Sequence, residues 1–367
     1  MRVLHVLNAF SAGGMENGVA NLSHGLFRKG IVFGICALTQ TDSFTLRLHP
    51  SVTIHQIDRG QGLDLSIWAA IRRIVVEHKY DVLHTHNWTG LIYGVPAGLW
   101  AGIPILHGEH SELFEWEKTL YRLAIRRLAY CWCNKVHILS QGQFSQLKRY
   151  RLLEGIDAVA ISNGTDVARF NPSNQEGARL KLGLPEKGFF IGLVGRMVAT
   201  KRHEFMLEAF LEAGTKEESL HLVFVGSGGN IERKVRELCE NHQLSNRIHW
   251  LGAHDDMPTV YSSLNILAIP SVNEGMANVA LESMACGVPV LANQVCGISE
   301  VIDDGVNGFV SPMFSSSMLA CRIVKLFNER DSLPEISVSA RSKILAKFSI
   351  NQMVAAYASI YENLFQK

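Results

Sequence analysis

Two glutamates, Glu274 and Glu282, stand eight positions apart in NEGMANVALESMACGVPVLAN (273–293), a segment whose other residues are mostly apolar or small. Paired carboxylates can act as an acid and a base, as metal ligands, or as acceptors for ligand hydroxyl groups. The preceding LNILAIP is typical of a strand, so Glu274 should fall in the loop after it. Gly275, Met276 and Ala277 should then lead into a helix that runs to about Cys286 and is stopped by Gly287 and Pro289.

The backbone N–H groups of residues 275–279 would then lie at a helix N-terminus, which attracts anions. With a rise of ~1.5 Å per residue, Glu282 lies about 6 Å along the helix from Asn278, and Glu274 precedes its start. The two carboxylates therefore flank a site that favours phosphate. A carboxylate beside phosphate needs hydrogen-bond donors, and sugar hydroxyls on both sides of a pyrophosphate would supply them. This arrangement predicts a nucleotide sugar, with the hexose at one end and the ribose at the other.

Two other segments could meet an anion. Arg196 and Lys201 lie between the strand-like FFIGLVG and a helix that begins near His203, where two added cations are costly unless an anion is shared. In SAGGMENGVANL, Gly13 and Gly14 follow the first strand and open a helix. A solvated basic turn and a ligand-free strand-to-helix turn remain the alternatives. The spacing of the glycines does not match G-x-G-x-x-G, which disfavours a nicotinamide dehydrogenase.

Histidines gather at the predicted ends of two strands in the first half of the chain, His84 and His86 in HTHNW and His107 and His110 in HGEHS. Most such histidines are structural. As a zinc site the set is weak, because no H-x-x-x-H helix and no supporting cysteine accompany it.

The elements that must position these residues follow one pattern twice. At 367 residues the chain is long enough for two domains. Strand-like runs alternate with helical ones before and after residue 185, which predicts an α/β fold with two parallel sheets. The polar segment SNGTDVARFNPSNQEG predicts a hinge near residue 170. We expect a first domain of residues 1–170, joined by a C-terminal helix (349–367), and a second of residues 171–348, with ligands in a cleft at the carboxyl ends of the strands.

Composition limits the partners and the compartment. Thirty-five basic residues balance thirty-four acidic ones, so no field favours nucleic acid. Seven scattered cysteines predict reduced thiols in a cytoplasmic protein, and the N-terminal apolar run is too short for a secretory signal. The segment 116–135 mixes arginines with tryptophan and tyrosine. It is either an ordinary half-exposed helix or a peripheral contact with the cytoplasmic face of the inner membrane.

In these segments the sequence resembles the retaining glycosyltransferases of family four, which have the GT-B fold. The resemblance covers nearly the whole chain, and E-x7-E combined with G-R-x-x-x-x-K is its most specific part. The matching segments are GGMENGVANL, DVLHTHNW, HGEHS, SNGTDVARFNP, GRMVATKRHEFMLEAF, VFVGSGG, EGMANVALESMACGVPVLA and SEVIDDGVNGFV. The resemblance implies two Rossmann-like domains, a nucleotide-diphosphate sugar held mainly by the second, and an acceptor met mainly by the first. It also implies retention of configuration with no metal ion or other cofactor.

The family's functional residues map onto this chain position by position. Arg196 and Lys201 would hold the diphosphate, Glu274 the donor-sugar hydroxyls and Glu282 the ribose. His110 would contact the donor sugar near the reacting carbon. The remaining donor-binding positions are Gly14 near the diphosphate, Leu251 near the base, and the backbone of Gly275, Met276, Ala277, Asn278 and Val279 around sugar and phosphate. Many members carry a second glycine and an aromatic residue where this chain has Met276, Ala277 and Asn278, so the preferred sugar stays open.

Family frequency alone favours UDP-glucose or a related UDP-hexose as donor, and a glycan or lipid-linked acceptor of cell-surface polysaccharide or exopolysaccharide synthesis. Two alternatives stay open. One is a nucleotide-sugar 2-epimerase of the same fold, and the other is an inactive sugar-binding subunit.

Overall fold

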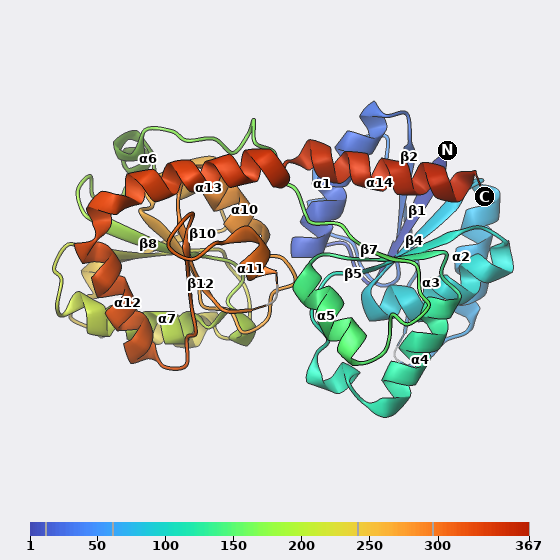
Figure 1. The fold of residues 1–367 in the computed structure, drawn as a ribbon, viewed down its shortest axis with the longest axis horizontal. Helices are drawn as coiled ribbons and strands as arrows, with labels where there is room; N and C mark the ends of the chain where they lie inside the picture. The colour runs from blue at the N-terminus through green and yellow to red at the C-terminus, as the bar shows by residue number, and fades with distance from the viewer. Residues whose placement is uncertain (12, 61, 241, 296, 367) are drawn as a thin grey trace. The chain divides into compact units, whose positions relative to one another are not determined.

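The computed structural model describes residues 1–11, 13–60, 62–240, 242–295 and 297–366. Its contacts divide the chain into two compact units (Figure 1). Unit 1 consists of Met1–Gly164 and Ile350–Lys367, and unit 2 of Thr165–Ser349. The boundary expected near residue 170 therefore lies a few residues inside unit 2.

Unit 1 contains a parallel sheet. Within the described residues its seven strands have the order β3-β2-β1-β4-β5-β6-β7. The chain starts at β1, builds outward to β3, and then returns to β4 on the other side of β1, so the strand order reverses between β1 and β4. The strands are β1 (Arg2–Leu7), β2 (Val32–Ala37), β3 (Thr53–Gln56), β4 (Val82–His86), β5 (Ile105–Glu109), β6 (Lys135–Ile138) and β7 (Ala158–Ala160).

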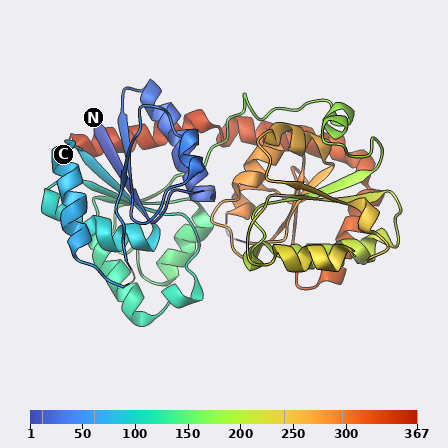
Figure 2. The same cartoon turned by 180° about the vertical axis from the view of Figure 1, so that it is seen from behind.

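Helices cover both faces of this sheet (Figure 2). Alternate strand residues point to opposite faces, and each face has its own apolar core. Val3 and Leu7 pack with α1 and α14, whereas Leu4 and Val6 pack with α2 and α3. The helices are α1 (Gly14–Arg28), α2 (Ser66–Glu77), α3 (Asn87–Ala101), α4 (Leu120–Cys131), α5 (Gln141–Arg149) and α14 (Ile350–Phe365), with short turns η1 (Ser43–Arg47) and η2 (Glu115–Glu117).

Helix α14 completes unit 1 although it comes last in the sequence, and it lies beside α1 (Figure 1). Its inner face buries Met353, Tyr357 and Leu364, while Ile360 is only half-buried. The two helices approach so closely that a Cβ on Gly25 of α1 would collide with Val354.

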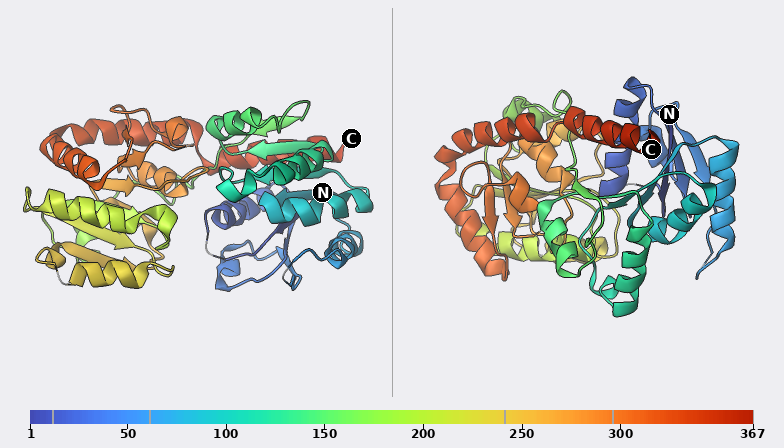
Figure 3. Two further views of the ribbon diagram at one scale, coloured as in Figure 1. Left: turned by 90° about the horizontal axis from the view of Figure 1, so that it is seen from below. Right: turned by 45° about the vertical axis from the view of Figure 1, so that its right-hand side comes forward.

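Unit 2 has a second parallel sheet, of six strands in the described residues, in the order β10-β9-β8-β11-β12-β13. Its strand order reverses between β8 and β11, and helices lie on both of its faces (Figure 3). The strands are β8 (Phe189–Val194), β9 (Leu220–Val225), β10 (Ile248–Gly252), β11 (Ile266–Ile269), β12 (Val290–Asn293) and β13 (Phe309–Ser311). The helices are α6 (Gln175–Lys181), α7 (His203–Gly214), α8 (Glu232–Glu240), α9 (Met257–Ser263), α10 (Asn278–Ala285), α11 (Ile298–Val301), α12 (Ser316–Asn328) and α13 (Leu333–Lys347), with turns η3 (Ala199–Lys201), η4 (Ser245–Arg247) and η5 (Arg330–Ser332).

Two parallel sheets with helices on both faces confirm the predicted fold class. The uncharged run 87–108 forms helix α3 followed by strand β5. Among the described residues, none of the helices combines the length and apolarity needed to cross a bilayer. The six described cysteines are free thiols, and Cys296 lies outside the described residues.

Candidate active site

The predicted anion-binding residues of unit 2 follow two neighbouring strands. Arg196 and Lys201 come after β8, and Glu274 comes after β11. The two strands pair directly, with Ile191 opposite Ile266. This is the point where the strand order reverses, and open parallel sheets bind their ligands at the carboxyl ends of such strands.

Lys201 and Glu274 are in direct contact. The Nζ atom of Lys201 lies 2.5 Å from Oε1 of Glu274, and the Glu274 side chain is 11% exposed. The two loops are also joined through the backbone, because the Val272 N–H donates to the Thr200 carbonyl at 3.1 Å. Sequence reasoning assigned the two residues to different parts of one ligand but did not predict this ion pair.

Arg196 is exposed. Its guanidinium makes no hydrogen bond or ion pair with other residues in the described ranges. Since Lys201 is already paired with Glu274, Arg196 is the cation of this loop that an anionic ligand can reach without breaking a contact in the protein.

Glycines let the surrounding loops approach these residues closely. Gly297 has φ +76°, and a Cβ there would collide with the carbonyl of Gly275. Gly226 has φ +121°, and a Cβ there would collide with the carbonyl of Gly195. A side chain at either position would push the neighbouring loop away, so both glycines are required for this geometry.

Helix α10 begins at Asn278, directly after the three residues that the sequence predicts to lead into it, and the preceding Ala277 makes no side-chain cap. Gly275, Met276 and Ala277 are buried in the loop before it, and Asn278 and Val279 are half-buried. The helix ends as expected, because Gly287 takes the left-handed conformation (φ +75°).

Glu282 is half-buried on α10 and accepts a hydrogen bond of 2.7 Å from the hydroxyl of Tyr261 on α9. Burial raises the pKa of Tyr261 well above its ordinary value, and the nearby Glu282 carboxylate adds to this, so the phenol remains a donor. Sequence reasoning missed Tyr261, because its contact with Glu282 joins two separate helices and no local pattern reports it. Leu251 is half-buried near the end of β10, two strands away from β8.

His110 and Gly14 belong to unit 1, unlike the other predicted site residues. His110 follows β5, and its backbone N–H donates to the Asn87 side chain at 2.9 Å. Burial lowers the pKa of His110 to about 4 against a smaller opposing effect of Glu109, so the ring is neutral at pH 7. Gly14 is exposed in the first turn of α1. The Glu16 carboxylate occupies the space that a Cβ of Gly13 would fill, so an acidic group already lies at this helix end.

A hollow of about 270 Å³ lies in unit 1 at the carboxyl ends of β1, β4 and β5. Trp88 and Trp116 line it together with the carboxylates of Glu16, Glu109 and Glu117. Glu109 and Glu117 are fixed by the buried Arg126, at 3.0 and 2.6 Å. Sequence reasoning did not assign these residues, because their common location depends on pairing between separate strands.

The segment 116–135 does not present a row of unpaired basic side chains to solvent. Arg126 is buried, and Lys118 pairs with Glu115 at 2.6 Å. The exposed side of α4 is instead apolar and aromatic. Its exposed large hydrophobic residues are Leu120, Tyr121, Ile125 and Leu128, with Trp132 just beyond the helix.

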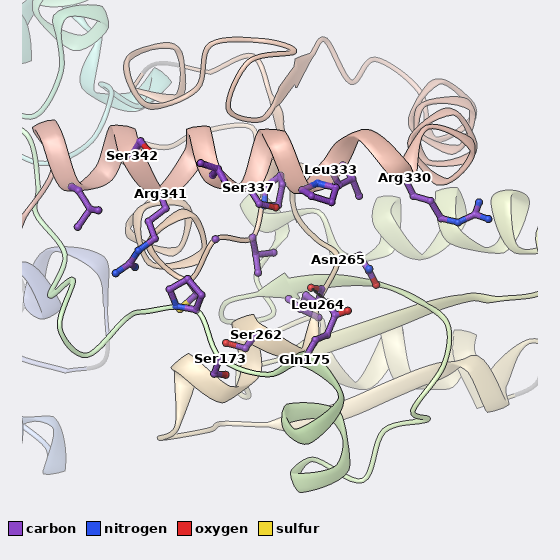
Figure 4. A pocket seen from close by; sticks show the side chains of 18 residues that line it. Ser173, Gln175, Ser262, Leu264, Asn265, Arg330, Leu333, Ser337, Arg341 and Ser342 are labelled. Carbon is purple, nitrogen blue, oxygen red and sulfur yellow. Dashed lines mark hydrogen bonds between the residues drawn. The ribbon is translucent and has the colours of Figure 1, made fainter.

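A second hollow, of about 650 Å³, lies in unit 2 near the opposite ends of the strands (Figure 4). Leu264 and Val288, which precede β11 and β12, line it, and α13 forms one wall. It is therefore separate from the loops that carry Lys201 and Glu274.

Comparisons with known proteins agree with this architecture. Residues 12–169 match the model of Glycosyltransferase Family 4, and residues 174–343 match that of Glycosyl transferases group 1. A curated relative from Corynebacterium jeikeium, D-inositol 3-phosphate glycosyltransferase, is 27% identical over 96% of this chain and 92% of its own length.

Solved structures match over almost the full length. Anabaena Alr3699/HepE in complex with UDP and glucose superposes with a TM-score of 0.86 at 20% identity, over 99% of this chain and 100% of that one. Sucrose-phosphate synthase from Thermosynechococcus elongatus gives a TM-score of 0.87 at 21% identity, over 100% and 99%. The two family models together span almost the whole chain, and the protein therefore belongs to the family-four glycosyltransferases of the GT-B fold.

Proposed function

We propose that the protein is a retaining hexosyltransferase. It moves a hexosyl group from a UDP-sugar such as UDP-glucose to a glycan or lipid-linked acceptor in cell-surface polysaccharide synthesis, in the cytoplasm and without a metal ion. The observation that carries the proposal is the Lys201–Glu274 pair beside the exposed Arg196, where the strand order of unit 2 reverses.

These residues suit the chemistry of the donor. Arg196 and Lys201 bind the diphosphate and stabilise the negative charge that develops on it as the bond to the sugar breaks, an electrostatic effect that is usually a large part of catalysis. Glu274 accepts hydrogen bonds from the hexose hydroxyls, and Glu282, held by Tyr261, accepts them from the ribose. The acceptor hydroxyl attacks the face that the diphosphate leaves, and its proton passes to the departing phosphate oxygen. The products are the glycoside and UDP.

The names of relatives support a UDP-hexose donor. Anabaena Alr3699/HepE is described in complex with UDP and glucose and, in another structure, with UDP-glucose. The curated relatives are described as D-inositol 3-phosphate glycosyltransferases.

The hollow in unit 1 supports a hydroxylated acceptor. Indole rings offer apolar faces to the C–H side of a sugar, and fixed carboxylates accept hydrogen bonds from its hydroxyl groups. Trp88 and Trp116 provide the first kind of contact and Glu16, Glu109 and Glu117 the second.

The exposed apolar face of α4 supports a peripheral contact with a bilayer, which would bring the protein to a lipid-linked acceptor. Leu120, Ile125 and Leu128 would enter the interface, and Tyr121 and Trp132 suit its polar boundary. The double variant Leu120→Ser/Ile125→Ser should lose co-sedimentation with vesicles of phosphatidylglycerol and phosphatidylcholine. Leu180→Ser/Val338→Ser, which changes exposed apolar residues of unit 2, should retain it. Equal retention by both variants would exclude α4 as the membrane contact.

The donor site is tested by calorimetric titration with UDP and by transfer from UDP-[13C]glucose to a panel of acceptors. Arg196→Ala should weaken UDP binding about 10- to 100-fold, the effect of losing one charge-assisted contact. Arg233→Ala, at an exposed arginine of α8, should bind UDP as the unchanged protein does.

The anomeric configuration of the product, read by NMR, tests retention, and the rate in EDTA tests metal independence. Transfer undiminished in Arg196→Ala would refute the site assignment. Release of UDP with epimerised sugar and no acceptor-dependent product would instead identify a 2-epimerase.

A further inference from the structure

A row of histidines crosses the face of the unit 1 sheet that α14 covers. Alternation along the strands directs His5, His84 and His86 to the same face as Val3 and Val82, which pack in the core beneath α1 and α14. His137 of β6 reaches this group across β5 because β5 has a glycine, Gly108, directly beside it. A Cβ at Gly108 would collide with the His137 ring.

The side chains form one continuous series of hydrogen bonds that begins at His110. The His110 Nε2 atom lies 2.7 Å from His86 Nδ1, and His86 Nε2 lies 2.9 Å from His5 Nδ1. His5 Nε2 lies 3.2 Å from the hydroxyl of Tyr361 on α14, which in turn lies 2.7 Å from His84 Nδ1.

The series ends one residue further, because His84 Nε2 lies 3.0 Å from His137 Nε2. The hydroxyl of Tyr357 on α14 makes a longer contact of 3.4 Å with the His137 ring. We call His110, His86, His5, Tyr361, His84 and His137 the histidine chain.

The rings of the chain are neutral. Burial lowers the pKa of His5 to about 3 and that of His110 to about 4, and it holds the pKa values of the other three rings well below 6.5. A neutral imidazole has one N–H donor and one acceptor nitrogen. Each inner ring of the chain uses both nitrogens, so if one ring changes tautomer, its neighbours must change as well.

Two states of the chain use the Tyr361 hydroxyl both as a donor and as an acceptor, and so leave no proton inside the chain without an acceptor. In one, every donor points from α14 toward His110, so His86 Nδ1–H donates to His110 Nε2 and the proton of His110 is on Nδ1. In the other, every donor points the opposite way and His110 carries its proton on Nε2. The hydroxyl of Tyr361 can donate in either direction, so it does not select between them.

The end at Tyr357 distinguishes the two states. In the first, the Tyr357 hydroxyl donates to Nδ1 of His137. In the second, His137 Nδ1–H faces the Tyr357 oxygen. The buried hydroxyl proton of Tyr357 then has only His137 Nε2 within reach, also at 3.4 Å, and the lone pair of that nitrogen already accepts from His84. Buried donors without an acceptor are costly and rare. The count of donors thus favours the first state, which leaves His110 Nδ1–H as the donor that faces away from the chain.

We propose that His86, His5 and Tyr361 are positioning residues that hold His110 as its Nδ1–H tautomer. The Nδ1–H group of His110, which faces away from the chain, then donates a hydrogen bond to an oxygen of the donor sugar. This inference rests on the proposed role of His110 in the transferase reaction. It also gives α14 a function in catalysis, because the hydroxyl of Tyr361 is the one link of the chain that does not come from the sheet.

The test reads the tautomers directly. Protein labelled with 15N-histidine is compared with Tyr361→Phe and with the control Tyr80→Phe, which removes a buried tyrosine hydroxyl 3.0 Å from His55, outside the chain. Long-range 1H–15N spectra, assigned with His110→Asn, should show a protonated Nδ1 and an unprotonated Nε2 at His110. In Tyr361→Phe both tautomers should be populated, and kcat should fall about three- to tenfold with the donor KM unchanged. Tyr80→Phe should change neither.

A milder variant covers the case in which Tyr361→Phe does not fold. Tyr357→Phe keeps the chain but removes the donor at its end, so it should also populate both tautomers of His110. A wild-type His110 protonated on Nε2, or unaltered His110 signals in both variants, would overturn the proposal. So would a stoichiometric metal ion, found by elemental analysis and lost in His5→Asn, because the rings would then be ligands. Full transfer by His110→Asn would instead refute the proposed role of His110, while the spectra would still decide whether the chain sets the tautomers.

Discussion

The ion pair between Lys201 and Glu274 joins two groups that the proposed reaction uses separately. In the structure, the Glu274 carboxylate pairs with the ammonium group of Lys201. In the proposed reaction, the donor's diphosphate takes the place of Glu274 as the partner of Lys201, and the carboxylate becomes available to sugar hydroxyls. The pair thus keeps two partly buried charges compensated until substrate arrives.

This exchange of partners predicts opposite effects of one substitution on two ligands. Glu274→Gln releases Lys201, so UDP should bind as tightly as to the unchanged protein or more tightly. The kcat/KM for the UDP-sugar should nevertheless fall about 100-fold, because the amide is a poorer acceptor for the sugar hydroxyls. Calorimetry with UDP and initial rates with the UDP-sugar separate the two effects. Glu237→Gln, which removes an exposed partner of Arg233, serves as the control. If Glu274→Gln lowered the affinity for UDP as much as the kcat/KM for the UDP-sugar, the exchange of partners at Lys201 would be contradicted.

The phenol of Tyr261 should matter for the nucleotide. Tyr261→Phe removes the donor that orients Glu282, and UDP binding should weaken about three- to tenfold, the usual effect of one hydrogen bond. Deoxyuridine diphosphates should lose less affinity than UDP in this variant, because they lack a ribose hydroxyl for Glu282 to bind. A uniform loss across these nucleotides would place the effect elsewhere in the site.

At the scale of elements, the loops of unit 2 depend on glycine for two separate reasons, and two variants separate them. Gly297 and Gly305 have similar positive φ angles, +76° and +73°. A Cβ at Gly297 collides with the carbonyl of Gly275, whereas a Cβ at Gly305 meets nothing within 4 Å.

Gly305→Ala should therefore lose only about 1 kcal/mol of stability, the cost of the backbone conformation. Gly297→Ala should lose more and should also weaken UDP binding, because the loop before α10 is displaced. Thermal unfolding and UDP titration of both variants check this. Equal stability and equal UDP affinity of the two variants would mean that the contact between Gly297 and Gly275 does not support nucleotide binding.

The sequence predicts the elements of this fold better than the contacts among side chains. Strand-like and helical runs determine two parallel sheets, and a position after β8 or β11 already implies a position at a ligand-binding edge. Tyr261 and the histidine chain were not predictable in this way. Their partners come from segments far apart in the sequence, such as His84 and Tyr361, and no local pattern reports which side chains will meet.

At the scale of the whole molecule, the buried histidines predict how stability depends on pH. Their pKa values are lowered in the folded state, to about 3 for His5 and about 4 for His110, from an ordinary 6.5. As the pH falls below about 6.5, the unfolded chain takes up protons that the folded unit does not. The free energy of unfolding should therefore decrease between pH 6.5 and about 4, by at most about 1.4 kcal/mol per pH unit for each such histidine.

Urea unfolding followed by tryptophan fluorescence measures this for unit 1, because every tryptophan except Trp250 belongs to that unit. The stability should be nearly constant from pH 7 to 8 and should fall steadily below pH 6.5. A midpoint that does not change between pH 6.5 and 4.5 would show that these histidines are already protonated in the folded protein.

The position of α14 in the sequence has a consequence for synthesis in the cell. Unit 1 begins with residue 1 but is complete only when residues 350–367 have been made, whereas unit 2 is contained within residues 165–349. The ribosome therefore releases all of unit 2 before it releases the helix that covers His5 and His84. The N-terminal sheet is translated first, but its second face is the last to be covered. Until α14 packs on it, the apolar residues beneath α14 are exposed to solvent and accessible to chaperones.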